Sequence, residues 1–300
     1  IPAELDIVLL QQRGTRNTSV HLDCSELPRS DWTTYEKGMT EAEAEVFQIG
    51  VFKSCIDSFE SQGVNLNAYN SVENAADVDA VREALGYERF IYYGASYGSQ
   101  LGQHVLRDFP GTVEAVILDG ANSLSRKSWV EDRALDAQWG INNLTKLCDE
   151  DRICRENLDI PGLVEAALAL FDKGPLPFRY SDPADPALTV EGKLTTDDMV
   201  SLIYEMQGSV IGAFSLPATL QVLSSGDVEQ AVEILGQRRG SALVASRNAP
   251  AETGMAMLMH TAMVCSDDPV HSTSDVITKG TGRYATAFGK SIAEQYVAMC

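Results

Sequence analysis

The sequence predicts an α/β fold in which a parallel sheet carries an inserted, mainly helical second unit. Strand and helix patterns alternate along the first third of the chain, and this order is typical of a right-handed parallel sheet. From about residue 125 to residue 260, the pattern changes to one helix after another. The chain has 300 residues, of which 44% are hydrophobic, and this is enough for one core with one insertion.

The clearest helix is expected over residues 70–85, just before the first strand. Asn70 is a suitable N-cap residue, Glu73 occupies the third helical position, and Gly86 is suited to end the helix. The apolar face of this helix is predicted to carry Val72, Ala76, Val81 and Leu85.

Short apolar runs predict the strands. Residues 90–93 are uniformly apolar, which is typical of a parallel strand buried on both faces. A helix over 97–108 is expected to follow and to stop at the Pro-Gly pair after it, and the next strand is expected at 113–118. The apolar run at 5–10 also has the composition of a strand.

The middle of the chain is expected to form a helical cap inserted after a sheet strand. Two segments within it, 174–177 and 181–186, are rich in Pro, Gly or Asp and are predicted to be loops. Its helices are predicted at 129–147, 161–171, 196–206, 216–223 and 228–235. The expected domains are a partial core at 1–123, the cap at 124–262, and at 263–300 a return segment toward the C-terminal part of the core.

A G-x-S-x-G pattern, Gly94-Ala95-Ser96-Tyr97-Gly98, lies between the first strand and the helix after it. A nucleophile elbow requires this context, because its glycines permit a tight turn that lifts the serine Oγ out of the sheet. The backbone N–H of the next residue then points to where an oxyanion develops. We therefore predict that Ser96 is a nucleophile and that the Tyr97 N–H is an oxyanion donor. The alternative is a serine in an ordinary Gly-rich turn.

The chain is strongly acidic. It has 43 Asp and Glu residues against 23 Lys and Arg residues, a formal net charge of -20. Such a surface repels phosphate backbones and anionic lipids, so nucleic acid and membrane surfaces are poor partners. An acidic surface of this kind suits a solvated, exported protein. The alternative is that its negative electrostatic field attracts cationic peptides. The apolar runs are shorter than the roughly 20 residues of a membrane-spanning helix, so no span is expected.

Six cysteines fall into three pairs that are close in sequence. No CxxC pattern and no Cys/His cluster has the spacing of a zinc site, so no metal is expected. The even number favours disulfides in an oxidising compartment over free buried thiols, and thus a secreted, periplasmic or cell-envelope protein. The expected pairs are Cys24 with Cys55, Cys148 with Cys154, and Cys265 with Cys300.

Several segments along most of the chain form an ordered set. They are DIVLLQQRGT at 6–15, followed by Leu22-Asp23-Cys24, then NAAD at 74–77, LGY at 85–87, YGASYGS at 93–99, LDGA at 118–121 and AMVCSD at 262–267. In this order they resemble the secreted proline iminopeptidase and tripeptidyl aminopeptidase family of serine peptidases, whose D-x-V-x-x-D-Q-R-G-T segment is similar to residues 6–15. The resemblance implies an α/β-hydrolase sheet, here partial, with an inserted helical cap domain.

The chain departs from the family pattern in one loop near the nucleophile. Gln11 stands where the family has Asp, and the sequence TRNT at 15–18 replaces a small, Gly-containing turn. These differences concern the substrate more than the fold. Arg13 is expected either to brace the loops around the site or to be a buried arginine satisfied by carbonyl groups.

The partners of Ser96 are expected to lie outside this chain. In this fold the order is nucleophile, acid and then histidine, and a second oxyanion donor comes from an upstream H-G-G-type loop. Neither that loop nor the strands that carry the acid and the histidine is found here. We therefore expect a fragment truncated at both ends that has little or no activity alone.

The four histidines of the chain are not expected to complete a triad. His21 precedes the elbow, and His104 lies about two turns after Ser96 on the wrong face of its helix. His260 and His271 follow in the required order, but neither is followed by the usual terminal helix. All four are expected to be structural or solvent-facing.

Three aspartates are weighed for roles at the site. Asp119 ends the second strand, from which some α/β-hydrolases supply the triad acid, although bonding to local backbone N–H groups is the favoured role. Asp267 and Asp268 lie where the cap returns toward the active-site mouth. They are candidates for holding the α-amino group of a substrate.

The resemblance implies an exported aminopeptidase that releases N-terminal residues or short peptides through an acyl-enzyme on Ser96, without a cofactor. A carboxylesterase is the first alternative, because the elbow does not distinguish an ester from an amide. The second alternative is a catalytically inactive binding protein. The sequence gives no indication of the number of subunits.

Overall fold

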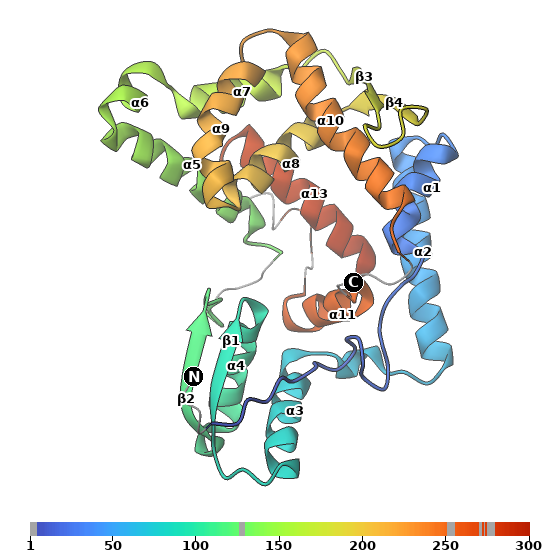
Figure 1. Cartoon of the computed structure of the whole chain (residues 1–300), viewed down its shortest axis with the longest axis vertical. Helices are drawn as coiled ribbons and strands as arrows, with labels where there is room; N and C mark the ends of the chain where they lie inside the picture. The colour runs from blue at the N-terminus through green and yellow to red at the C-terminus, as the bar shows by residue number, and fades with distance from the viewer. Residues whose placement is uncertain (1–4, 126–129, 251–255, 270–271, 273, 275–279) are drawn as a thin grey trace.

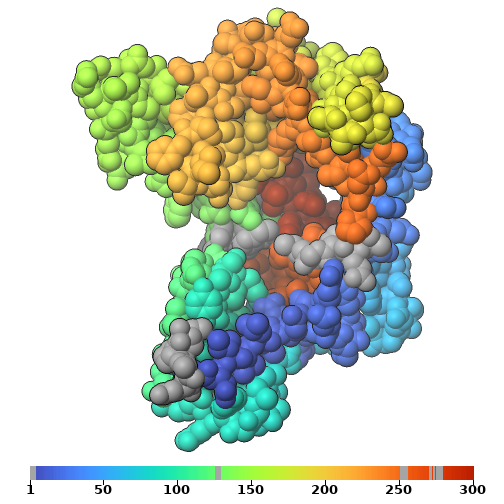
Figure 2. Space-filling view, viewed as in Figure 1, coloured from blue at the N-terminus to red at the C-terminus, as the bar shows by residue number. Residues whose placement is uncertain are grey.

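The structure, a computed structural model, describes residues 5–125, 130–250, 256–269, 272, 274 and 280–300. Figure 1 shows a lower part that contains a small parallel sheet and an upper part that is mainly helical, with long helices along one side between them. The face in view is hollowed between the two parts (Figure 2). None of the helices in the described ranges combines the length and the hydropathy that a bilayer-spanning segment needs.

The sheet of the lower part has two strands in the described chain. Strands β1 (Phe90–Ala95) and β2 (Val113–Asp119) are parallel and pair through to Ala95 and Asp119 at their carboxyl ends. The crossover between them is α4 (Tyr97–Asp108), followed by the short 3-10 helix η3 (Pro110–Thr112). These elements confirm the predicted strand, helix and strand.

The prediction that the first strand is buried on both faces is wrong. One face of the sheet packs on α4, and on this side Val113, Leu101 and Val105 are buried. On the other face Ile91 and Tyr93 are 50% and 62% exposed. The physical reason is that, in the described part of the chain, helices cover only one side of these two strands.

Helix α3 (Ser71–Ala84) has the predicted ends but a different buried face. The Asn70 side chain accepts a hydrogen bond from the Glu73 N–H at 2.9 Å, and Gly86 ends the helix with φ +76°. The predicted apolar face is wrong at both of its ends, because Val72 and Leu85 are about half exposed. The buried residues are Ser71, Asn74, Ala75 and Val78. Two of these are polar, and both form hydrogen bonds with side chains of α11 (Met257–Asp267).

The predicted strand at 5–10 is absent from the structure, in which described residues 5–12 form no strand. Leu9 is 88% exposed, and Asp6 accepts a hydrogen bond from the Tyr87 hydroxyl at 2.6 Å. An apolar composition alone does not make a strand, because the backbone groups also need a partner strand.

Between this segment and α3 lie four elements that the sequence analysis did not assign. They are the 3-10 helices η1 (Leu27–Arg29) and η2 (Leu66–Ala68) and the helices α1 (Ser30–Glu36) and α2 (Glu41–Ser61). Helix α2 begins with a capping box in which the Thr40 side chain accepts from the Glu43 N–H and the Glu43 carboxylate accepts from the Thr40 N–H. Helices α1 and α2 run along the side of the molecule between its two parts (Figure 1).

The upper part contains each of the predicted cap helices, although residue 129, where the first was expected to begin, lies outside the described residues. Its buried core draws on most of these helices and includes Val164, Ile203, Leu220 and Leu235. The observed helices are α5 (Arg133–Glu150), α6 (Arg152–Asn157), α7 (Ile160–Ala169), α8 (Thr196–Gln207), α9 (Val210–Leu223) and α10 (Val228–Arg247).

The two segments predicted as loops flank one strand of a hairpin. Residues 174–175 and 182–186 are loops as predicted, whereas residues 176, 177 and 181 lie in the strand, so the prediction is wrong there. Strands β3 (Leu176–Ser181) and β4 (Thr189–Leu194) are antiparallel, so the first segment enters a strand and the second forms the connection. Phe178 and Tyr180 alternate inward and pack on α10 at Gly236 and Gly240. Inward-facing residues at every second position are the sequence signal of a strand. Here the prolines on either side favoured a loop prediction instead.

Helix α13 (Arg283–Met299) joins the return segment to the upper part. Its Tyr284 and Phe288 are buried in the core of the upper helices, and the Phe288 ring stacks on Tyr204 of α8 at 4.0 Å between ring centroids. The division into segments 1–123, 124–262 and 263–300 stays a prediction.

The structure contains all three predicted disulfides. Cα–Cα distances are 5.8 Å for Cys24–Cys55, 5.0 Å for Cys148–Cys154 and 5.4 Å for Cys265–Cys300. The first joins the N-terminal segment to α2, the second joins α5 to α6, and the third joins α11 to the end of α13.

Removing the Cys24–Cys55 disulfide by a double alanine substitution is expected to lower the free energy of unfolding by about 3 to 4 kcal/mol. Its sequence separation is 31 residues, so it restricts the unfolded chain strongly. The matched control is the Cys148–Cys154 pair, whose separation of 6 residues predicts a loss of only about 2 kcal/mol. Urea unfolding of both variants measures the difference, and equal losses would contradict this loop-size account.

Candidate active site

Ser96 lies at the turn between β1 and α4, at the carboxyl end of the sheet. Its backbone has φ +52° and ψ -120°, a conformation that is costly for a residue with a side chain. The Ser96 N–H donates to the carbonyl of Asp119 at 2.9 Å, which ties the turn to the end of β2. Ser96 itself is exposed, so the turn presents its hydroxyl to solvent.

The approach of α4 to β1 requires a glycine at position 94. A Cβ atom on Gly94 would lie 2.1 Å from the carbonyl oxygen of Gly98, one turn into the helix. An added Cβ on Gly98 would instead make only an ordinary van der Waals contact, with the Tyr92 hydroxyl at 3.9 Å. That hydroxyl donates to the Gly98 carbonyl at 2.8 Å, and burial raises the pKa of Tyr92 to about 12. The phenol therefore remains a donor at neutral pH.

Ser99 and Gln103, on the inner side of α4, hold the chain that leaves β2. The Ser99 hydroxyl donates to the Ser96 carbonyl at 2.6 Å and accepts from the Asn122 N–H at 2.9 Å. The Gln103 amide donates to the Asn122 carbonyl at 2.5 Å and accepts from the Leu124 N–H at 3.3 Å. The elbow and the segment that enters the upper part are thus bonded to each other.

Tyr97 follows Ser96 and is the first residue of α4. The first N–H groups of a helix have no acceptor within the helix, so the Tyr97 N–H can serve as the predicted oxyanion donor. Its hydroxyl lies 2.9 Å from the Ser71 hydroxyl, which in turn bonds to Asp267. Two of the predicted site residues, Tyr97 and Asp267, are therefore linked through a residue that the sequence analysis did not single out.

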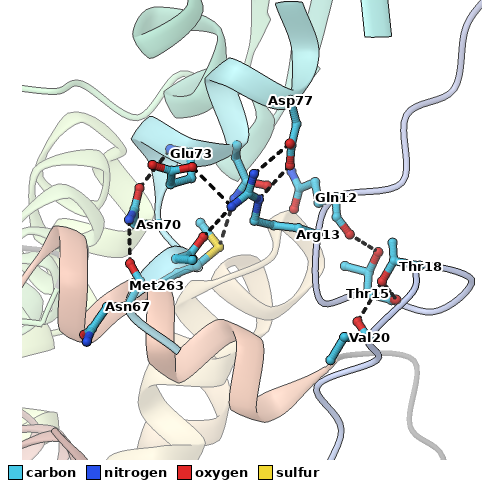
Figure 3. A network of polar contacts seen from close by, with 12 residues as sticks. Gln12, Arg13, Thr15, Thr18, Val20, Asn67, Asn70, Glu73, Asp77 and Met263 are labelled. Atoms are coloured by element: carbon cyan, nitrogen blue, oxygen red, sulfur yellow. Dashed lines mark hydrogen bonds and ion pairs between the residues drawn. The ribbon is translucent and has the colours of Figure 1, made fainter. Parts of the chain in front are cut away.

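Arg13 joins the N-terminal loop to α3 through carboxylates and also bonds to one carbonyl group, so its contacts combine features of both expected roles. It forms a bidentate pair with Asp77, with both N–O distances 2.7 Å, and it donates to the Ala68 carbonyl at 2.7 Å and to Glu73 at 3.3 Å (Figure 3). The same loop contains Gln11, which is exposed and whose side-chain oxygen lies 3.4 Å from the Thr15 hydroxyl.

The hydrogen bonds in the described ranges connect none of three histidines to Ser96. His21 pairs with Gly14 in an isolated bridge, and His104 is 8% exposed on the inner side of α4. Burial and the charge of Arg107 lower the pKa of His104. His260 lies 2.9 Å from the Tyr296 hydroxyl, and its pKa is lowered by burial and then by Arg133. His271 lies outside the described residues.

The predicted acids differ in their surroundings. Asp119 is exposed and accepts from the Tyr93 hydroxyl at 2.7 Å, and its own carbonyl accepts from Ser96, so it is engaged locally. Asp267 is half-buried, and both of its carboxylate oxygens face Ser71. Asp268 is half-buried beside it. Among the described residues, no group of three or more His, Cys, Asp and Glu side chains is arranged to hold a metal ion.

A model of the alpha/beta hydrolase fold family matches residues 3–157, about half of the chain, including the elbow. The chain belongs to the α/β-hydrolase fold family. Within this family, the positive φ of Ser96 and the close contact at Gly94 are the local geometry of a nucleophile elbow. The fold class predicted from the sequence is therefore confirmed.

Two kinds of curated relative are similar to this α/β-hydrolase chain. The serine protease Hip1 of Mycobacterium tuberculosis, like that of Mycobacterium bovis, is 30% identical over 194 residues, which cover 64% of this chain and 34% of the relative. The tripeptidyl aminopeptidase of Streptomyces lividans is 33% identical over 87 residues, 27% of this chain and 16% of the relative. The matches thus span about a third of the first relative's length, or less. They support the predicted resemblance to serine peptidases of the tripeptidyl aminopeptidase kind.

Sequence reasoning missed the residues that support the elbow of this α/β-hydrolase. Ser71, Tyr92, Ser99 and Gln103 act through hydrogen bonds to the backbone or to other side chains, and no short motif marks them. One signal was available, since Ser99 follows the G-x-S-x-G pattern directly and lies three residues after Ser96.

Proposed function

We propose that Ser96 is the nucleophile of a serine peptidase that releases single residues or short peptides from the N-termini of its substrates. The observation that carries this proposal is the elbow, where an exposed serine with φ +52° begins a helix at the carboxyl end of a parallel sheet. The similarity to a serine protease and to a tripeptidyl aminopeptidase supports a peptide substrate rather than another acyl compound.

In the proposed mechanism, the Ser96 Oγ attacks the scissile carbonyl and its proton passes to a histidine base. The oxyanion is stabilised by the Tyr97 N–H at the start of α4. The base then protonates the leaving amine, and water hydrolyses the acyl-enzyme. The His260 ring bonds to Tyr296, and no hydrogen bond in the described ranges joins His21 or His104 to Ser96, so we place the base, and the acid that orients it, outside the described residues.

We also propose that the protein works in an oxidising compartment, either secreted or in the cell envelope. Three disulfides join segments that are far apart or at a chain turn, and no described cysteine is free. Such bonds persist outside the cytosol. The net charge of -20 is compatible with a protein that stays in solution there.

The proposal is tested by substrate choice, with the protein made from its complete reading frame. Aminoacyl and tripeptidyl arylamides with a free N-terminus are expected to be cleaved, and the same compounds with an acetylated N-terminus are expected to be poor substrates. Small acyl esters serve as the comparison, since the same nucleophile can cleave them. Ester turnover without arylamide cleavage would favour a carboxylesterase. Failure of a fluorophosphonate to label Ser96 would favour a binding protein.

A further inference from the structure

We propose that Asp267 is a positioning residue that fixes the nucleophile elbow through Ser71 and Tyr97. This differs from the role expected from the sequence, in which Asp267 holds the α-amino group of the substrate. The inference rests on the proposed role of Ser96 as the nucleophile, but not on the identity of the substrate.

The carboxylate of Asp267 is directed at a single residue. Its two oxygens accept from the Ser71 N–H at 3.1 and 3.0 Å, and one of them accepts from the Ser71 hydroxyl at 2.5 Å. Ser71 is the first residue of α3, and a negative charge is favourable at the positive end of a helix. Asp267 thus holds the start of α3 with charge-assisted hydrogen bonds.

The hydroxyl of Ser71 transmits this contact to the elbow. It has one hydrogen, which it donates to Asp267, so it accepts from the Tyr97 hydroxyl, 2.9 Å away. Ser71 is fully buried, and water does not compete for these bonds. Burial raises the pKa of Tyr97 well above its usual range, so the phenol keeps its proton. The order of donation is therefore Tyr97 to Ser71 to Asp267.

Tyr97 is placed so that its side chain controls the backbone at the nucleophile. Its ring packs both against the cluster that contains Phe52 and Met263 and against the cluster that contains Leu101 and Val113. Its backbone N–H is the proposed oxyanion donor, and Ser96, the residue before it, has the costly positive φ. Rotation of an unanchored Tyr97 would change both the direction of that N–H and the position of the Ser96 Oγ.

Asp267 is itself well anchored. It ends α11, two residues after Cys265, and the disulfide to Cys300 joins this end of α11 to the end of α13. The chain of hydrogen bonds thus connects α4, α3 and α11. These elements come from distant parts of the sequence, since Asp267 lies 196 residues from Ser71.

The experiment compares Asp267→Ala, Asp267→Asn and Tyr97→Phe on arylamides and on acyl esters. We expect Asp267→Ala to lower kcat by about 10- to 100-fold with KM unchanged, less than the loss of a whole oxyanion donor. Asp267→Asn keeps one acceptor oxygen, so its kcat is expected to lie between those of the parent protein and Asp267→Ala. Ester and amide turnover should drop by the same factor, and adding Tyr97→Phe to Asp267→Ala should cause little further loss, because both remove the same connection.

A matched control is Glu60→Gln, which removes one negative charge from an exposed position on α2 and is expected to leave kcat unchanged. The positioning role is overturned if Asp267→Asn raises KM for substrates with a free N-terminus while esters and N-acetylated compounds are unaffected, since that is the pattern of an amino-group ligand. It is also overturned if the two substitutions in the double variant act additively.

A readout that needs no substrate separates this inference from the proposed function. Amide hydrogen exchange across residues 96–108 is expected to be faster in Asp267→Ala than in the parent protein, whether the protein cleaves amides, esters or neither. Unchanged exchange in this segment would overturn the inference while leaving the peptidase proposal intact. If the protein does not cleave arylamides but Asp267→Ala exchanges faster, the peptidase proposal is overturned and the inference about Asp267 stands.

Discussion

Replacing Ser96 with alanine is expected to lower kcat by roughly 10⁴- to 10⁶-fold, with almost no change in the thermal unfolding midpoint. The hydroxyl would be the attacking atom, so without it no acyl-enzyme forms. Stability should be preserved because Ser96 is exposed, its backbone bond to Asp119 does not involve the side chain, and alanine has the same steric requirement at φ +52°.

The measurement is the rate of arylamide and ester cleavage together with thermal unfolding of the same preparations. Ser54→Ala, at an exposed position on α2, is the control for removal of a serine hydroxyl and is expected to leave both quantities unchanged. Activity in Ser96→Ala within tenfold of the parent protein would show that another residue is the nucleophile.

The local structure around Ser96 could be predicted from the sequence because its signals are local. The caps of α3, the apolar run that became β1 and the G-x-S-x-G turn lie within 29 consecutive residues, 70–98, and each is specified by its own neighbours. Periodicity and turn chemistry act over this range, so they place Ser96 correctly at the end of a strand.

The surroundings of Ser96 could not be predicted in the same way, because they depend on contacts between distant segments. Val72 was expected to be buried, yet the buried side of α3 carries Ser71 and Asn74, whose hydrogen-bond partners belong to α4 and α11. A buried polar residue is stable only when such a partner is present, and the sequence does not reveal the partner. Asp267 was predicted as a site residue, which stays a prediction, and its contact with Ser71 emerges only from the fold.

The hairpin shows a different limit. Phe178 and Tyr180 alternate inward as in any half-buried strand, but the prolines around them predict loops. Burial against α10 at two glycines outweighs this local preference, because a Cβ at Gly240 would lie 2.3 Å from the Tyr180 ring. Tertiary packing commonly overrides composition in this manner.

Gly94→Ala is expected to destabilise the protein by roughly 3 kcal/mol or more and to abolish the elbow, whereas Gly98→Ala is expected to be nearly neutral. Both glycines are fixed positions of the G-x-S-x-G motif, but the atoms around them differ. A methyl group on Gly94 would lie 2.1 Å from the backbone oxygen of Gly98, and a backbone atom in the first turn of α4 cannot move without shifting the helix. On Gly98 the nearest atom is 3.9 Å away, and alanine favours a helix by up to about 1 kcal/mol over glycine.

Thermal and urea unfolding of the two variants, with labelling of Ser96 by a fluorophosphonate, measures both effects. We expect Gly98→Ala to unfold within about 0.5 kcal/mol of the parent protein or slightly above it and to keep its labelling, because the methyl group makes only an ordinary van der Waals contact and alanine reduces the freedom of the unfolded chain. If both variants lose stability equally, the motif acts through backbone flexibility at each glycine. If only Gly94→Ala does so, the requirement comes from the close approach of α4 to β1, which fixes the Ser96 backbone at its positive φ.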